Sequence, residues 1–141
     1  MANTATTTDD AKPKAPAAPL SAMAIMAPAL GWLVPGAGHL VQKRWIRGLL
    51  LMVSILSMFS IGVAMEGKIY LPNTGDLLDI LGFVGDIGNG GLYFLGRAME
   101  WGGQAITSAT SGYGTIYIVG AGLLNIITMV DAYHIARGRK A

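Results

Sequence analysis

Two long apolar runs without a charged residue constrain the fold more than any other feature of this chain. Residues 48–65 and residues 113–130 each extend for 18 residues without a charge, long enough for a helix to cross a hydrocarbon core about 30 Å thick. Charged residues make up only 13% of the 141 residues, about half of the usual share in soluble domains. We therefore expect an all-α integral membrane protein.

A third apolar run, residues 20–34, is shorter and leads into a segment that contains Pro and Gly. At about 1.5 Å per residue this run is too short for the bilayer core, so a spanning helix has to continue through Pro35 to about residue 41. Pro28 and Pro35 each remove a helical hydrogen-bond donor. The sequence predicts about three hydrophobic helices, the first one kinked or broken, at about 20–41, 48–65 and 113–134.

The N-terminal segment differs from the rest of the chain. Residues 1–19 are rich in Ala, Thr and Pro and contain no large apolar residue after Met1, which is typical of a disordered tail. An alternative is the front of a signal peptide, with residues 20–34 as its apolar region. Residues 20–141 are expected to form a single membrane domain, and the lack of Cys excludes disulfide scaffolds and thiolate metal sites.

The segment between the two long runs, residues 66–112, is acidic. It holds five acidic and two basic residues, and Asp79 and Asp86 would each cost about 2.5–3.5 kcal/mol at the bilayer centre. The glycines of residues 88–91 should interrupt any helix. We expect two short helical pieces here, interfacial or re-entrant, on the extracytoplasmic side.

The basic residues predict the orientation of the chain. Six of the ten lie in two clusters beside apolar runs: Lys43, Arg44, Arg47, Arg137, Arg139 and Lys140. Basic residues that flank membrane spans mark the cytoplasmic side. The C-terminus should therefore be cytoplasmic and residues 66–112 extracytoplasmic. This placement of the charges also argues against a nucleic-acid partner.

Small residues on the two long runs indicate close helix packing. They form a stripe on the first run and a patch on the second: Ser54, Ser57, Ser60 and Ala64, then Gly120, Gly122 and Asn125. Such residues let helix backbones approach each other, and an amide within a span needs an interhelical partner. Asn125 is therefore a candidate structural residue, as is Asn89 beside the glycines of the middle segment.

The segment Pro35, Gly36, Gly38 and His39 has two interpretations. The one we favour is a tight turn at a helix end, where Gly permits a positive φ. The alternative is an anion-binding turn that presents backbone N–H groups, with help from the basic residues at 43, 44 and 47. A Walker-type loop is excluded because no Gly-Lys-Ser/Thr follows.

Asp131 and His134 stand three residues apart and so share one helix face. The interpretation we favour pairs Asp131 with Arg44 or Arg47 and leaves His134 as an interfacial polar residue. One alternative joins His39 to Asp131 and His134 in a proton relay or metal cluster. Another has His39 and His134 ligate a haem or pigment.

The acidic residues Asp79, Asp86 and Glu100 could act as general acid and base. No nucleophile or set of oxyanion donors accompanies them in a recognisable order, and no known hydrolase or metalloprotease motif occurs. We therefore interpret them as a solvated acidic face and expect no enzymatic activity.

Several motifs resemble a bacterial family of short membrane proteins of unknown function. The similarity runs from about residue 25 to 140. It is carried by Pro35-Gly36-x-Gly38-His39, Gly85-Asp86-x-Gly88-Asn89, Tyr113-Gly114, Ala121-Gly122-Leu123-Leu124-Asn125 and Asp131-Ala132-Tyr133-x-Ile135-Ala136-x-Gly138-Arg139-Lys140. This resemblance implies a bacterial inner-membrane location and supplies no activity.

A weaker resemblance covers about a third of the chain. Gly36-Ala37-Gly38-His39 with Arg44 and Gly48, and the later Asp131-Ala132-Tyr133, are similar to the small two-transmembrane-helix domain family with its Gly-x-Gly-x-His linker. This chain lacks the aromatic residue and the Gly-Arg pair that follow the His in that family.

The function expected from the sequence is that of a non-enzymatic accessory or scaffold subunit of a bacterial inner-membrane complex. Its partners would be the lipid bilayer and other membrane subunits or further copies of itself, and it would hold no cofactor. The alternatives are an oligomeric pore or carrier that uses Asp79, Asp86 and Asn89, or a haem- or pigment-binding subunit that uses His39 and His134.

Overall fold

A computed structural model of the chain describes residues 21–72, 76–102 and 108–138. These residues form helices and no strand, in the order α1 (Ala22–Leu33), α2 (Ala37–Val41), α3 (Trp45–Ala64), α4 (Leu77–Gly88), α5 (Gly91–Ala98) and α6 (Ser111–Ala136). The predicted disordered tail, residues 1–19, lies outside the described residues. The all-helical prediction is confirmed for the part of the chain that the structure describes.

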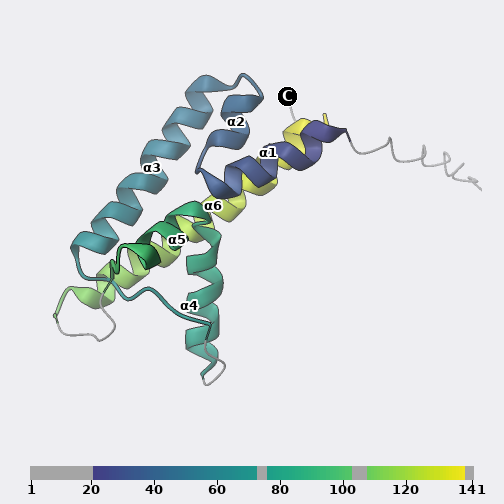
Figure 1. The fold of residues 1–141 in the computed structure, drawn as a ribbon. Helices are drawn as coiled ribbons and strands as arrows, with labels where there is room; N and C mark the ends of the chain where they lie inside the picture. Colours follow the sequence, from purple (N-terminus) through teal and green to yellow (C-terminus); the bar gives the residue numbers. More distant parts are fainter. Residues whose placement is uncertain (1–20, 73–75, 103–107, 139–141) are drawn as a thin grey trace, which may run out of the picture.

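The two longest helices, α3 and α6, form an antiparallel pair along the whole molecule (Figure 1). At one end Arg47 of α3 faces Asp131 of α6; at the other end Gly62 of α3 lies against the backbone of Gly114. Both helices are long and apolar enough to cross a membrane, by length and composition alone. They correspond to the predicted helices at 48–65 and 113–134, each extended by a few residues.

The predicted third long helix, at about 20–41, is not formed as one element. Helix α1 continues through Pro28 but ends at Leu33, and Val34 before Pro35 adopts an extended conformation with φ −125° and ψ 113°, as expected for a residue that precedes proline. Gly36 follows with a φ of +79°, and α2 then turns back along α1. The helix is broken at Pro35 rather than kinked, so a third full span is not confirmed.

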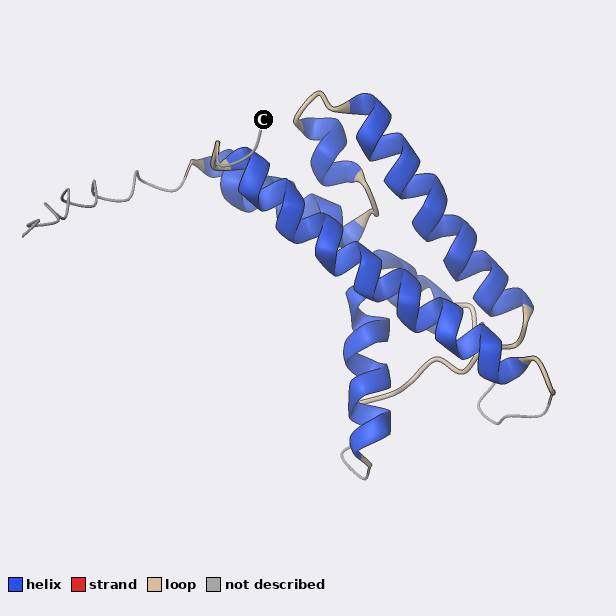
Figure 2. Cartoon of the chain, turned by 180° about the vertical axis from the view of Figure 1, so that it is seen from behind, coloured by secondary structure: helices blue, strands red, loops and turns tan. Residues whose placement is uncertain are grey.

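The middle of the chain forms two short helices, as predicted. Helix α4 ends at Gly88 and α5 begins at Gly91, so the glycine-rich segment interrupts the helix where the sequence indicates. The C-terminal part of α4 packs on the middle of α6, with Gly85 against Val119 and Gly88 against Gly122. From that contact α4 extends away from the long pair, whereas α5 runs from the end of α4 in the direction of the C-terminal end of α3 (Figures 1 and 2).

The core lies between α3, α5 and α6. Ile55 and Phe59 of α3 pack with Ile118 of α6 and Tyr93 of α5. The stripe of Ser54, Ser57, Ser60 and Ala64 points away from this core and is exposed. These four residues are therefore not used for packing within the described part of the chain, whereas Gly62 of the same helix is.

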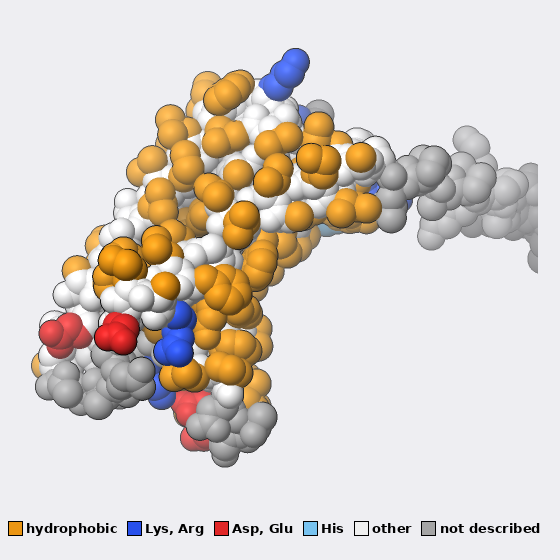
Figure 3. All heavy atoms as spheres, in the orientation of Figure 1, with side chains coloured by type: hydrophobic (Ala, Val, Ile, Leu, Met, Phe, Trp, Pro, Cys, Tyr) orange, Lys and Arg blue, Asp and Glu red, His pale blue; other side chains and the backbone are white. Residues whose placement is uncertain are grey.

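The two ends of the molecule differ in charge. In the view of Figure 3, the carboxylates lie in two groups at the lower end, one near the end of α3 and one near the free end of α4, with Lys or Arg side chains between them. Apolar side chains cover most of the remaining surface. The opposite end carries Lys43, Arg44, Arg47 and Arg137 together with Asp131. The antiparallel pair thus brings Arg137, which follows α6, to the same end as Lys43, Arg44 and Arg47; Arg139 and Lys140 of the second predicted cluster lie outside the described residues.

Candidate functional site

Asn125, near the middle of α6, is the centre of the first polar cluster. Its Nδ2 donates hydrogen bonds to the carbonyl oxygens of Gly88 at 2.9 Å and Trp32 at 3.3 Å. These carbonyls belong to the last turns of α4 and α1, where helices leave acceptors without an intrahelical donor. A single fully buried amide thus joins the ends of two short helices to α6, and we call Trp32, Ile87, Gly88 and Asn125 the midpoint junction.

Trp32 strengthens the midpoint junction with a bond of its own. Its indole Nε1 donates to the carbonyl oxygen of Ile87 at 3.0 Å. Donors from α1 and α6 therefore satisfy carbonyl groups at the end of α4. The carbonyl of Ile87 also accepts from the backbone N–H of Gly90, so the Trp32 bond is a second one there. The carbonyl of Gly88 accepts from Asn125, and a buried carbonyl group without a donor destabilises a protein by about 1–3 kcal/mol.

The backbone of α5 begins directly against the end of α1. Gly90 has a φ of +58°, a conformation that side chains of L residues rarely adopt. A Cβ atom at this position would overlap the carbonyl oxygen of Trp32. Glycine is therefore required here for two reasons: its backbone conformation, and the close contact of the α4–α5 hairpin with the end of α1 in the α1–α2 hairpin.

Asn89, which follows α4, makes a second amide contact with α6, about two turns before Asn125. Its Nδ2 donates to the carbonyl oxygen of Ile118 at 3.0 Å, and the side chain is fully buried. The oxygen of its amide has no hydrogen-bond partner among the described residues, and neither does that of Asn125. Asn89 and Asn125 thus act as donors to backbone carbonyls, as the sequence suggested for Asn125.

Asp86 of α4 holds the segment that connects α3 to α4. Its Oδ2 accepts a hydrogen bond from the backbone N–H of Tyr70 at 2.6 Å, and the side chain is fully buried. Thr115 accepts from the N–H of Lys68 at 2.8 Å, and the hydroxyl of Tyr93 donates to the carbonyl of Tyr70 at 3.2 Å. Residues 68–70 are therefore fixed by contacts from α4, α5 and α6.

The interpretation of Asp79, Asp86 and Glu100 as one solvated acidic face is wrong for Asp86. The packing of α4 against α6 and residues 68–70 encloses this carboxylate. Asp79 is only partly exposed and pairs with Lys68, whose Nζ lies 3.2 Å from Oδ1, whereas Glu100 is exposed. The three acids thus have three different environments.

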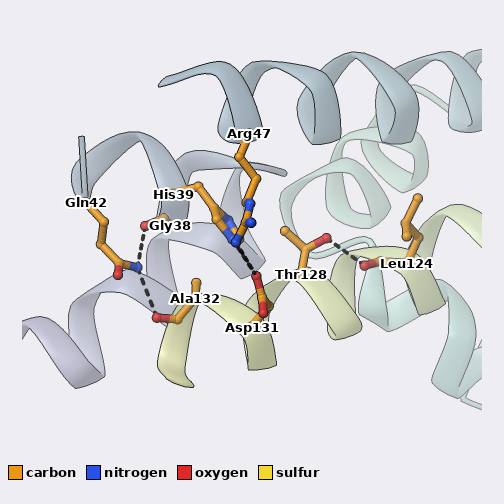
Figure 4. Close-up of polar contacts among 8 residues, drawn as sticks. All are labelled: Gly38, His39, Gln42, Arg47, Leu124, Thr128, Asp131 and Ala132. Atoms are coloured by element: carbon orange, nitrogen blue, oxygen red, sulfur yellow. Dashed lines mark hydrogen bonds and ion pairs between the residues drawn. The ribbon is translucent and has the colours of Figure 1, made fainter. Parts of the chain in front are cut away.

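The second polar cluster, which we call the His39 cluster, consists of His39, Arg47 and Asp131 and lies at the basic end. Figure 4 shows the side chains of His39 from α2 and Arg47 from α3 directed at Asp131 of α6. His39 Nε2 lies 3.1 Å from Asp131 Oδ2, and Arg47 Nη1 lies 3.6 Å from the same oxygen. His39 is fully buried and its Nδ1 has no partner among the described residues. The cluster therefore joins three helices through one carboxylate.

Gln42 adds a contact between α2 and α6 next to this cluster. Its Nε2 donates to the carbonyl oxygens of Gly38 at 2.8 Å and Ala132 at 3.0 Å (Figure 4). A Cβ at Gly38 would overlap the carbonyl oxygen of Ala27 and approach Ala132. Three helices thus meet closely at Gly38, which accounts for the Gly at this position.

The structure brings together only some of the predicted site residues. Asp131 pairs with Arg47, one of the two partners predicted for it. Arg44 instead precedes the first turn of α3, where its N–H donates to the carbonyl of His39 at 3.0 Å. The turn at Pro35 and Gly36 is tight and has the predicted positive φ.

His134 is partly exposed on α6, with its ring beside that of Tyr133. Among the described residues, no three His, Cys, Asp or Glu side chains gather in a way that could hold a metal ion. Because His39 Nε2 faces Asp131, ligation of a haem or pigment through that nitrogen would first have to break the His39 cluster. Paired ligation by His39 and His134 remains a prediction.

Sequence reasoning missed Trp32, Gln42 and Tyr70. Trp32 and Gln42 each donate a side-chain N–H to a backbone carbonyl. The hydrophobic pattern of the sequence does not indicate such bonds. Tyr70 contributes its backbone N–H and carbonyl groups, which carry no sequence signal. Only Gln42 could have been singled out from the sequence, because its amide lies between an apolar turn and a basic cluster and therefore needs a hydrogen-bond partner.

Comparison with known proteins gives a family and no activity. The chain matches no curated protein and no solved structure. A model of a family of unknown function, DUF6677, matches residues 26–141, which include both polar clusters. The chain therefore belongs to the family of unknown function DUF6677.

Proposed function

We propose that this protein is a non-enzymatic accessory or scaffold subunit of a membrane complex. The proposal rests on one contrast: the buried polar side chains bind this chain's own backbone, whereas the exposed side chains of the long helices are mainly apolar. The buried amides of Asn89 and Asn125 bind backbone carbonyls of the chain itself, while the long helices present mainly apolar side chains to their surroundings. Such a molecule offers helix surfaces to partners.

The exposure of α3 and α6 supports a membrane location. Only 22% of the residues in the apolar window of α3 and 33% of those in α6 are buried, whereas the core helix of a water-soluble protein would be mostly buried. Large apolar side chains on α3 such as Leu50 and Val53 are more than half exposed. In water these faces would form an extended apolar patch; in a bilayer they face lipid.

The distribution of charge supports one orientation in that membrane. The end with Lys43, Arg44, Arg47 and Arg137 would be cytoplasmic by the positive-inside rule, and the acidic end extracytoplasmic. The hairpins α1–α2 and α4–α5 would then enter from opposite sides and meet at the midpoint junction. Irregular backbone at membrane depth requires such burial within protein, and the inner membrane of a bacterium is the location that we propose.

The exposed stripe of α3 is the surface that we propose for a partner helix. Ser54, Ser57 and Ser60 are exposed, and among the described residues no helix of this chain covers them. Small polar residues on a spanning helix permit close approach and hydrogen bonds between helices. A further copy of the chain or another membrane subunit would pack there.

Co-purification tests this proposal. After extraction of the native membrane with a mild detergent, the tagged wild type should retain one membrane protein in stoichiometric amount or a second copy of itself. Ser57→Phe should reduce that retention several-fold. The matched control Ile127→Phe, at an exposed position of α6, should retain the partner. Strictly monomeric wild type without a partner would overturn the proposal.

A second candidate function, an oligomeric pore or carrier, has one observation in its favour. Asp86 is a fully buried carboxylate on a short helix that ends beside Asn89, and buried acids within membrane proteins often belong to ion pathways. Ion flux into liposomes that contain only this protein, lost in Asp86→Asn, would favour the pore or carrier over the scaffold.

A further inference from the structure

We propose that the corner between α2 and α3 binds the phosphate group of an anionic phospholipid through Lys43, Arg44 and Arg47. This inference rests on the proposed membrane location and adds a specific lipid to it. The corner comprises residues 43–47, which we call the basic corner.

The basic corner contains a shallow, open hollow whose lining residues include cationic and apolar side chains. A hollow of about 360 Å³ is lined by Lys43, Arg44, Trp45, Ile46 and Arg47. Three of these five side chains are cationic and two are apolar. A phospholipid offers the same two parts, because its phosphate lies directly above its acyl chains.

The charge of the basic corner is only partly balanced within the molecule. Among the described residues, no carboxylate lies within 4 Å of the charged nitrogens of Lys43 or Arg44, and Arg47 shares Asp131 with His39. Cations close to an anionic membrane surface are attracted to its lipid headgroups. The charge is thus complementary to an anionic lipid and not to a zwitterionic one.

The apolar residues of the basic corner have the exposure that a lipid neighbour requires. Trp45 is 67% exposed and Ile46 is 79% exposed, although both lie beside cations. Trp side chains prefer the headgroup level of a membrane, where the ring is partly in lipid and the N–H reaches water. Trp45 and Ile46 would thus contact the glycerol and upper acyl region while the cations hold the phosphate.

A neighbouring groove offers a place for one acyl chain. A groove of about 460 Å³ between α3 and α6 is lined by Leu51, Ile126, Ile127 and Val130, with Asp131 and His134 among its lining residues. Arg47 reaches Asp131 from the basic corner, so the groove and the hollow are connected by this ion pair. A lipid held at the basic corner could lay one chain along α6.

A lipid titration of the purified full-length protein tests the inference. The midpoint of thermal unfolding is measured in a mild non-ionic detergent while phosphatidylglycerol, phosphatidylcholine or soluble glycerol 3-phosphate is added. For the wild type we expect phosphatidylglycerol to raise the midpoint by several degrees more than phosphatidylcholine, with no rise from glycerol 3-phosphate. High salt should reduce the difference, because salt screens the exposed charges.

Two variants that each remove one positive charge, at different positions, test whether the basic corner is the binding site. Arg44→Gln should lose most of the preference for phosphatidylglycerol, and Arg44→Lys should retain it because the charge remains. Arg97→Gln, which removes an exposed cation from α5, should behave as the wild type. If Arg44→Gln keeps the full preference, the basic corner is not the site.

The remaining outcomes separate this inference from the proposed function. Equal stabilisation of the wild type by both lipids would overturn the lipid inference alone, since the protein would still require detergent. An equal rise with glycerol 3-phosphate would overturn it in favour of a soluble anion. Protein that stays soluble and monomeric without any detergent would overturn the membrane location itself.

Discussion

The amide nitrogen of Asn125 lies 2.9 Å from the carbonyl oxygen of Gly88, the last residue of α4. The same nitrogen also reaches the carbonyl oxygen of Trp32 near the end of α1. One side chain of α6 thus replaces the donors that two interrupted helices lack at their ends. In an apolar environment that offers no water, this replacement is what allows both helices to stop at the middle of α6.

The midpoint junction predicts a large effect of Asn125→Leu. Leu has a similar size but leaves the carbonyls of Gly88 and Trp32 without these donors, which should lower the free energy of unfolding by about 1–3 kcal/mol. Thermal unfolding in detergent measures the change. The control Thr128→Val removes only a bond to Leu124 within α6 and should have a much smaller effect. Equal effects of both variants would contradict the role of Asn125.

The contact between the two hairpins predicts that Gly90→Ala is not tolerated. The positive φ of Gly90 costs an L residue about 1–3 kcal/mol, and its new methyl group would overlap the carbonyl of Trp32. We expect aggregation or a strongly lowered unfolding midpoint by size-exclusion and thermal measurements. Gly112→Ala, where a Cβ meets no atom within 4 Å, should be neutral or slightly stabilising. A Gly90→Ala protein as stable as the wild type would exclude the observed contact.

The His39 cluster predicts unequal effects of replacing the two side chains, His39 and Arg47, that contact Asp131. His39 is fully buried at 3.1 Å from Asp131, whereas the side chain of Arg47 is 49% exposed at 3.6 Å. Arg47→Ala should therefore destabilise by less than about 1 kcal/mol, as exposed ion pairs do. His39→Ala leaves a cavity at a fully buried position, removes the contact to Asp131 Oδ2 and should cost about 2 kcal/mol or more. Chemical unfolding of both variants would reveal the difference, and the reverse order would contradict the geometry.

The interruptions of the helices could be predicted from sequence because they depend on local conformation. Pro35 restricts Val34, and glycine at positions 36 and 90 permits positive φ, whatever lies nearby. The long helices at 48–65 and 113–134 could also be predicted from the sequence, because an apolar run of about 18 residues without a charge is typical of a membrane-spanning helix. A kinked or broken first helix over 20–41 was predicted; the break is found at Pro35, and a full span over these residues is not confirmed.

The contacts between distant residues could be predicted only in part. An amide in an apolar helix needs a partner, so Asn125 could be singled out, but not its acceptors Gly88 and Trp32, which are backbone groups 37 and 93 residues away. Asp86 was misinterpreted because spacing along α4 shows which residues share a face and does not show what covers that face. Asp86 binds the backbone N–H of Tyr70, a group that almost every residue carries, so the sequence does not indicate this partner.

The hydrogen bond between Asp86 and Tyr70 predicts that stability depends on the acceptor oxygen at position 86 and not on its charge. Asp86→Asn keeps an oxygen that accepts from the N–H of Tyr70 and removes a buried charge, which is costly when unpaired. It should therefore be at least as stable as the wild type in thermal unfolding. Asp86→Leu lacks the acceptor, leaves a buried N–H unpaired and should destabilise by about 1–3 kcal/mol. If Asn and Leu destabilise equally, the carboxylate acts through its charge, for which Lys68 is a candidate partner, and not through the bond to Tyr70.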